Sequence, residues 1–424
     1  MPPSPLFASL AVLTIWTVVL GLIVGRFELF LAAVPLVVAL LSARKPVAAS
    51  SIGITANLSS MRLTEGDRLD LVVVVACPQA TSPSIEVFLP LPNTFEFVEG
   101  GPHLATSLRA DETFEWKLAV RSTARGRFVF GPFNVRVSDD AGLLVDEARV
   151  GSAVEIETYP RIPMIRQLPR PWHTRSSFGN YVAAQFGTGL EIAETRLFAP
   201  GDRVRQINWP ASQRLGRLYV NQFQQERSAD VVLLLDTMAE TGASPHSTLD
   251  ASVRAVTALA SAYIARKDRV GYVEFGAYLR WLKPAAGRRQ WERLLRSALP
   301  ASQHFTYLTR TLDHIPAAAL PRQALVIAVS PVIDERFTRA IVDLAGRGYD
   351  VVLLAVCPVG LTRRVLPDAP LSDVACALWM LERSSRLRQL RNEGITVAEW
   401  QPEQPLDAAL AALARRAPVR RAMP

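Results

Sequence analysis

The segment Asp236–Glu240 carries the side chains best suited to hold a ligand. It follows the apolar run Val231–Leu235, which predicts a buried strand. Ligands of open α/β sheets bind beyond the carboxyl ends of such strands. The carboxylates of Asp236 and Glu240 are of the type that Mg²⁺ prefers, but the thioether of Met238 between them is a poor ligand for this ion. The segment therefore predicts a binding edge at which ordinary metal binding is disfavoured.

The sequence lacks the common motifs of catalysis. It contains no glycine-rich phosphate loop, no GxSxG and no HExxH. Ser330 has no histidine partner nearby in the sequence, although a partner contributed from elsewhere in the fold stays open. His246 and His304 lie in polar segments that are typical of solvated loops. We therefore predict a protein that is not an enzyme and that has no cofactor.

The net charge is +8, and it is unevenly distributed. Residues 47–160 are acidic overall, whereas residues 161–424 hold the basic excess, most of it arginine. A basic surface suits either nucleic acid or the anionic heads of lipids. The charges are scattered and are not interleaved with aromatic residues, so we favour a domain held near a membrane and predict no nucleic-acid partner.

Residues 1–46 predict a transmembrane hairpin. The apolar run from Leu6 to Val24 is long enough to cross the hydrocarbon core, and no basic residue precedes it as in a signal peptide. The second run, Phe27–Ala43, is shorter and contains Pro35, so it either spans a thinned bilayer or re-enters it. The basic pair after it predicts cell-membrane localisation with two passes and cytoplasmic soluble domains. A single crossing would instead place the remainder outside.

Residues 47–160 predict a β-sandwich of the immunoglobulin type. Turn signals recur at short intervals, and the run Thr113–Arg121 alternates apolar and polar side chains. The phase of the alternation changes at Gly131-Pro132, which predicts a bulge or bend. No catalytic constellation lies in this region, so we interpret it as a spacer or interaction module.

Residues 229–424 predict an α/β domain with a doubly wound, mainly parallel sheet. Five apolar strands alternate with five segments of helical periodicity. Ser247–Asp250 is a capping box before the first helix, and Gly276-Ala277 predicts a hairpin to one antiparallel edge strand. Residues 161–228 come before this domain, and their prolines and arginines up to residue 185 predict a linker lying on the domains.

An arginine-rich segment, Arg196–Arg214, ends this linker region. Pro200-Gly201 predicts a turn in which Asp202 accepts hydrogen bonds from the following amides. Three arginines are available for bidentate pairing with carboxylates: Arg196, Arg205 and Arg214. Two interpretations stand side by side. Either the segment forms an internal cluster of arginine, carboxylate and Trp209, or it docks a partner.

This segment resembles the signature of domain-of-unknown-function family 58. The matching positions are Arg196, Phe198, Gly201, Asp202, Arg205, Ile207, Trp209, Ser212 and Arg214. A second run of the family matches at Gly126, Phe128, Gly131 and Pro132. The sequence departs from the family pattern after Trp209, where a basic residue is usual. The resemblance implies a membrane hairpin, a β-domain and a von Willebrand factor A-like domain.

In A-type domains the carboxyl edge of the sheet holds a metal-ion-dependent adhesion site. Its first loop reads Asp-x-Ser-x-Ser, so the resemblance places Met238 and Glu240 where serines belong. Thr306 matches the threonine position, and Ser330-Pro331 replaces a Ser-Asp pair. We expect a degenerate site without a bound metal, although Glu240 leaves weak Mg²⁺ binding open. These residues are then candidates for partner binding: Asp236, Met238, Glu240, Thr306 and Ser330.

The resemblance also implies a partner. Proteins of family 58 accompany MoxR-type AAA+ ATPases, which suggests a membrane-anchored interaction or scaffold protein in the assembly or maturation of a client protein. Two alternatives remain. One is an envelope-associated hydrolase, and the other is an extracytoplasmic adhesion module with reversed topology.

Overall fold

A computed structural model describes residues 4–43, 47–77, 84–109, 112–139, 141–171, 175–200, 202, 204, 207–307 and 311–415. The side chains of residues 175–194 and 222–228 are not described. The chain divides into two compact units, Met1–Tyr159 and Pro160–Pro424.

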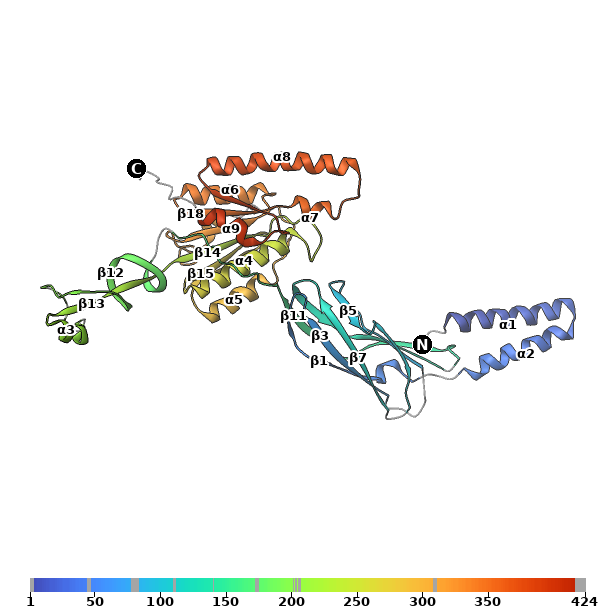
Figure 1. Cartoon of the computed structure of the whole chain (residues 1–424). Coiled ribbons are helices and arrows are strands. Elements are labelled where there is room, and N and C mark those ends of the chain that lie inside the picture. Colours follow the sequence, from blue (N-terminus) through green and yellow to red (C-terminus); the bar gives the residue numbers. More distant parts are fainter. Residues whose placement is uncertain are drawn as a thin grey trace. The chain divides into compact units, whose positions relative to one another are not determined.

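The first unit begins with two apolar helices, α1 (Pro5–Val24) and α2 (Phe27–Ser42) (Figure 1). Gly25 turns the chain between them with a φ of 68°. Among the described helices, α1 alone is long and apolar enough to cross a membrane, whereas α2 has 16 residues. The Ser4 amide donates to the carbonyl of Leu143 at 3.1 Å, so the start of α1 contacts a loop of the β-rich region that follows α2.

Eleven described strands complete this unit. They are β1 (Gly53–Leu58), β2 (Arg62–Thr64), β3 (Arg68–Ala76), β4 (Ser84–Phe88), β5 (Phe95–Glu99), β6 (His103–Ser107), β7 (Thr113–Ser122), β8 (Gly126–Phe130), β9 (Phe133–Ser138), β10 (Val145–Val150) and β11 (Val154–Tyr159). They form three sheets, ordered β1-β3-β7-β5, β10-β9-β4-β6 and β2-β11-β8, around one apolar core.

The phase change predicted at Gly131-Pro132 marks a passage between sheets. Strand β8 pairs with β11, whereas β9, two residues later, pairs with β4 and β10. Gly131 has a φ of 79°, and a Cβ at this position would lie 3.0 Å from the carbonyl oxygen of Ser152. A side chain there would therefore be strained and would also clash.

The second unit contains a six-stranded sheet. Its strands are β14 (Asp230–Asp236), β15 (Arg269–Phe275), β16 (Leu279–Ala285), β17 (Leu325–Ser330), β18 (Asp350–Val356) and β19 (Thr396–Trp400). The order is β16-β15-β14-β17-β18-β19, and β16 is the antiparallel edge strand. The predicted strands and the hairpin at Gly276-Ala277 are thus found in the structure.

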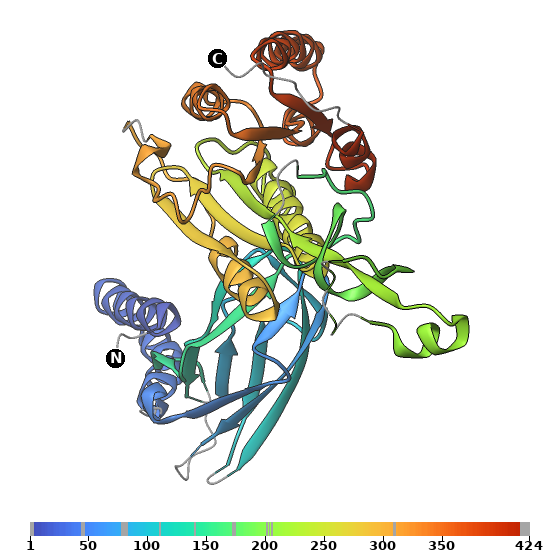
Figure 2. The ribbon, with the colours of Figure 1, turned by 90° about the vertical axis from the view of Figure 1, so that its left-hand side faces the viewer.

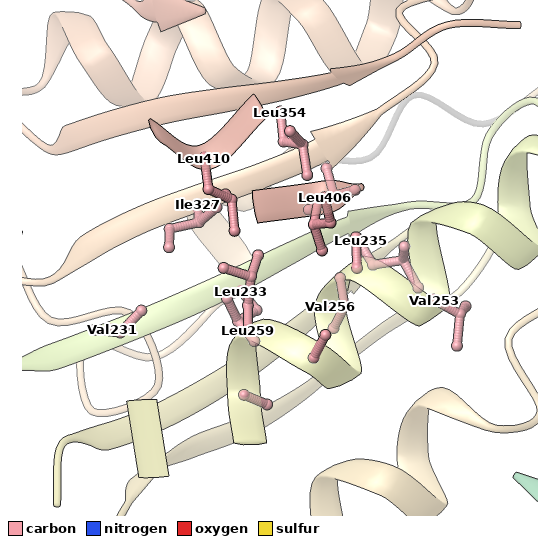
Figure 3. Packing of buried hydrophobic residues seen from close by; sticks show 14 of the residues in the cluster. Val231, Leu233, Leu235, Val253, Val256, Leu259, Ile327, Leu354, Leu406 and Leu410 are labelled. Atoms are coloured by element: carbon pink, nitrogen blue, oxygen red, sulfur yellow. The ribbon is translucent and has the colours of Figure 1, made fainter. Parts of the chain in front are cut away.

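Helices cover both faces of this sheet (Figure 2). The helices that cover it are α4 (Thr248–Ala265), α5 (Arg288–Ala298), α6 (Glu335–Gly346), α8 (Pro370–Asn392) and α9 (Leu406–Ala414), and the short α7 (Val359–Arg363) follows β18. One core lies under α4, α5 and α9, where Leu259 and Leu410 meet the strands (Figure 3). The other lies under α6 and α8. Ser247 caps α4 as its part in the predicted capping box requires, since the Asp250 amide donates to Ser247 Oγ at 3.0 Å.

The sequence interpretation of residues 160–185 as a linker is right only for its first part. Strand β12 (Arg175–Leu197) pairs with β13 (Tyr219–Ser228) as an antiparallel ribbon, with α3 (Trp209–Leu215) between them. The ribbon has several register shifts, beginning between Ser176 and Tyr181. These shifts interrupt the alternation by which a strand is recognised in a sequence.

Residues 160–171 do lie on the α/β unit, as predicted. Leu168 is buried in its core, and one carboxylate oxygen of Asp407 accepts the amides of Arg166 and Gln167 at 2.9 and 2.8 Å. The buried hydroxyl of Tyr263 donates to the Pro169 carbonyl at 2.6 Å.

Tyr263→Phe is expected to loosen this docked segment. The Pro169 carbonyl loses its buried donor, which lowers the free energy of unfolding by about 1 kcal/mol. Chemical denaturation of the full chain measures the change. Tyr349→Phe is the control. It removes a longer, partly buried hydrogen bond, from the Tyr349 hydroxyl to the Leu320 carbonyl at 3.3 Å, so the free energy of unfolding is expected to fall by less. Equal losses would contradict a specific role for the Tyr263 hydroxyl.

Candidate functional site

Asp236 is the last residue of β14, the strand from which the chain adds later strands first on one side of the sheet and then on the other. Strand β14 continues to β15 on one side and neighbours β17 on the other, so its carboxyl end is the switch point of the sheet. The side chain is buried. Its Oδ1 accepts the Met238 amide at 2.9 Å, and its Oδ2 accepts the hydroxyl of Ser330 at 2.5 Å. The structure therefore brings together Asp236 and Ser330, as the family resemblance implied.

The loop after β17 is held in a strained conformation. Ser330 Oγ also accepts the amide of Val332 at 2.8 Å. Val332 has a φ of 58°, which is costly for a β-branched residue. The buried guanidinium of Arg383 donates to the carbonyls of Pro331 and Val356, the latter at 3.1 Å. Helix α8 thereby fixes the ends of β17 and β18.

Burial raises the pKa of Asp236 to about 7, because a charged carboxylate is disfavoured away from water. The hydrogen bonds from Ser330 and Met238 oppose this rise, and the nearby charge of Asp334 adds to it. Burial also acts to raise the pKa of Asp334, but hydrogen bonds from Arg336 lower it overall. The site thus contains one carboxyl that ionises near neutrality and one paired carboxylate.

The donor set at Asp236 does not fit an adhesion-type metal site. Both carboxylate oxygens already accept hydrogen bonds, and Met238 is buried. Glu240 is half-buried in the loop before α4. In the described part of the chain, no three histidine, cysteine or acidic side chains come together as a metal site.

Thr306 reaches the site through its main chain. Its carbonyl accepts from Arg336 Nη1 at 2.7 Å, and the same guanidinium pairs with Asp334 at 2.7 Å. Earlier in this loop, Gln303 Nε2 donates to the carbonyl of Met238 at 3.2 Å. The segment after α5 is therefore bound to the loops that follow β14 and β17.

This segment presents two aromatic rings that the sequence analysis missed. Phe305 and Tyr307 are 79 % and 89 % exposed, and their rings pack edge to face with the ring centroids 4.8 Å apart. The residues flanking Thr306 follow no helical or strand periodicity, so only their aromatic character marks them in the sequence. Exposed aromatics beside polar groups are typical of protein-binding surfaces.

The signature segment lies on the β12–β13 ribbon, where its described residues shape turns. Arg196 forms a bidentate pair with Asp202, at 2.8 and 2.7 Å. Asp202 also accepts the amide of Ala199 at 2.8 Å. The prediction that it accepts the following amides concerns a turn that lies mostly outside the described residues. Gly201 and Arg205 lie outside the described residues.

The internal cluster, one of the two interpretations of this segment, is found only in part, because Arg196 pairs with Asp202 whereas the side chain of Trp209 is 62 % exposed. Trp209 begins α3, and Asn208 caps this helix by accepting the amide of Ala211 at 3.1 Å. Ser212 Oγ accepts the Tyr219 amide at 2.8 Å and ties α3 to the ribbon. Phe198 and Ile207 are half-buried, and Arg214 is exposed.

Together these features define a multidomain chain with an N-terminal apolar helix, a β-rich region and an α/β domain. Residues 194–370 match the family model described as "Protein of unknown function DUF58". The match confirms the resemblance to this family over the signature and most of the α/β domain. No curated protein matches the chain.

Solved structures resemble parts of the chain only weakly. The CARDB domain of the PF1109 protein from Pyrococcus furiosus shares 13 % identity over 27 % of this chain and 88 % of its own, with a TM-score of 0.20. An alpha-2-macroglobulin fragment from Escherichia coli shares 16 % over 31 % of this chain and 21 % of its own, with a TM-score of 0.23. A FixG-related protein from Vibrio parahaemolyticus shares 7 % identity over 26 % of this chain and 96 % of its own, with a TM-score of 0.19. Scores this low carry no functional argument.

Proposed function

We propose that the chain is a membrane-anchored, non-enzymatic interaction protein. Its partner-binding surface is the edge formed by the loops after β14 and β17 together with the segment Gln303–Tyr307. The aromatic pair Phe305 and Tyr307 carries this proposal, because large exposed rings on a hydrogen-bonded loop are suited to enter a partner's pockets. Arg336 and Asp334 supply a polar margin to the aromatic pair.

The buried Ser330–Asp236 pair supports a structural role over a catalytic one. Ser330 is fully buried, and its hydroxyl is engaged with Asp236 and the Val332 amide. A nucleophile needs access to its substrate and a base that takes its proton. An acid with a raised pKa is a known mark of active sites, but here the carboxyl serves to lock two loops together.

The membrane anchor rests on α1. The hydrogen bond from Ser4 to Leu143 supports a hairpin whose two ends lie on the same side of the bilayer. With two passes the soluble units are in the cytoplasm, which is the side that the basic pair after the second apolar run in the sequence, Arg44 and Lys45, favours. We further propose that the α/β unit is a von Willebrand factor A-like domain, since its strand order and antiparallel edge strand suit that fold.

The family resemblance suggests a MoxR-type AAA+ ATPase as the partner, acting with this chain on a client protein. Capture of partners from membranes by the tagged full chain, read by mass spectrometry, is the direct test. A stoichiometric AAA+ ATPase is the expected result. Wall-building or secretion proteins in its place would favour an envelope scaffold.

Loss of the aromatic pair is expected to abolish this capture. A Phe305→Ala, Tyr307→Ala double variant removes exposed rings, so folding is expected to be unchanged while partner recovery falls by tenfold or more, or about 1.4 kcal/mol at least. Met164→Ala is the control, because this side chain is 84 % exposed but lies outside the proposed surface. Unchanged recovery with the double variant would move the binding surface elsewhere.

A further inference from the structure

Helix α8 has one face that packs against the α/β unit and one that does not. Arg383, Leu387 and Leu390 are buried, and the half-buried Ser372, Cys376 and Trp379 continue the same line toward the start of the helix. At 3.6 residues per turn these positions lie on one side. The other side of α8 therefore faces outward, and Figure 1 shows α8 as an outer helix of the unit.

The outward side changes character halfway along the helix. In the first half it carries four apolar side chains at spacings of three and four residues, each between 56 and 80 % exposed: Leu371, Val374, Leu378 and Leu381. In the second half the same side is polar, with Glu382, Ser385 and Arg388. We call the four residues the α8 stripe. An apolar stripe of this kind is expected to be covered in the working protein.

The dimensions of the α8 stripe favour lipid over a second copy of the chain. Stable protein interfaces use about 20 to 30 residues on each side, and the stripe supplies four. A run of 12 residues, Pro370–Leu381, is too short to span a bilayer but has the length of a segment lying in its interface. Acyl chains of lipids form no hydrogen bonds, so apolar side chains alone are enough to contact them.

The charges around the α8 stripe suit a lipid surface. Asp373, the acid within Pro370–Leu381, pairs with Arg363 at 2.9 Å. Arg388 lies seven residues after Leu381 and so on the same side of the helix, and it forms no ion pair within the described residues. A long arginine at the end of an apolar stripe can place its guanidinium among phosphate headgroups.

We propose that the first half of α8 lies on the lipid bilayer, with the α8 stripe inserted at the boundary between headgroups and acyl chains. This inference rests on the proposed anchoring by α1, which supplies the membrane. The family match ends at residue 370, so the stripe begins where the matched region stops. The α/β unit is then held against the membrane at a second place, apart from the hairpin.

The test uses the full chain, with its three cysteines replaced by alanine, in phosphatidylcholine vesicles with or without phosphatidylglycerol. An environment-sensitive fluorophore is attached at Leu378→Cys. Its emission is expected to shift to shorter wavelength, to be largely lost when the lipids carry chain nitroxides, and to resist aqueous iodide. Phosphatidylglycerol should strengthen the effect, and Arg388→Gln should remove that dependence.

Ser385→Cys is the matched control, because it lies seven residues after Leu378 on the same side of α8 and should respond to iodide alone. Leu13→Cys in α1 tests the anchor independently. Lipid quenching at position 13 without quenching at position 378 would overturn the α8 proposal and leave the anchor intact. Shielding from iodide without lipid quenching would also overturn it, in favour of a protein partner or a second copy. No lipid quenching at position 13 would instead refute the anchor.

Discussion

Asp236→Asn is expected to stabilise the α/β unit above pH 7 and to reduce its loss of stability between pH 4 and 7. The folded-state pKa of Asp236 is about 7, against 3.8 for an exposed aspartate. Below pH 4 both states hold the proton. As the pH rises, the unfolded chain ionises first, so the free energy of unfolding falls until the folded carboxyl has ionised as well.

The size of this effect follows from the pKa difference. A pKa of about 7 in the folded state against 3.8 in the unfolded chain corresponds to a fall of about 4 kcal/mol in the free energy of unfolding between pH 4 and pH 8. Asparagine can still accept the Met238 amide and meet Ser330 Oγ, but it never carries a charge. The difference between variant and parent should therefore grow with pH in denaturation of the full chain in detergent.

Asp343→Asn is a suitable control, since this carboxylate is exposed and paired with Arg347 at the surface. Parallel pH curves for Asp236→Asn and the parent would show that Asp236 is not protonated in the folded state. Added Mg²⁺ is expected to leave the unfolding midpoint of the parent unchanged at neutral pH. A Mg²⁺-dependent rise that Asp236→Asn abolishes would point to a weak metal site with Glu240.

Gly276→Ala is expected to destabilise the loop that follows Asp236, because the added methyl group would clash with Thr237. A Cβ at residue 276 would lie 2.0 Å from Thr237 Oγ1, although the backbone there is not left-handed. Thr237 is buried and its amide donates to the carbonyl of Phe275 at 2.9 Å, so it cannot move freely. We expect a loss of about 1–3 kcal/mol, as for other overpacked positions.

A double-mutant cycle isolates the cause. In a Thr237→Ala background the hydroxyl is absent and the next contact is 3.3 Å, so Gly276→Ala should cost much less. Gly346→Ala, where nothing lies within 4 Å of the added Cβ, is the control and should be neutral or slightly stabilising. An equal cost of Gly276→Ala in both backgrounds would contradict a clash with Thr237.

Regular periodicity made the α/β unit predictable. The run Val231–Leu235 is buried on both faces, as a central parallel strand must be, and Ser247 caps α4 as its spacing to Asp250 indicates. The family resemblance implied that Ser330 lies at the site of Asp236, and the topology explains why, because the adjacent parallel strands β14 and β17 end at one edge.

Features set by tertiary contacts were not predictable in this way. The β12–β13 ribbon shifts register repeatedly, so its strands have no simple alternation. In the sequence Arg383 cannot be told from the other arginines of its helix. In the structure it is buried and donates to the carbonyls of Pro331 and Val356. Phe305 is apolar but exposed, a position that hydrophobicity alone would place in the core.

The pairing of β2 with β11 has a consequence for synthesis on the ribosome. Thr64 pairs with Tyr159, so the edge at β2 has no partner until nearly a hundred further residues have been made. At about 5–20 residues per second, this interval lasts several seconds or longer. Throughout that time a growing chain, whose first helix has already emerged, carries an open strand edge that nascent-chain chaperones can shield from other chains.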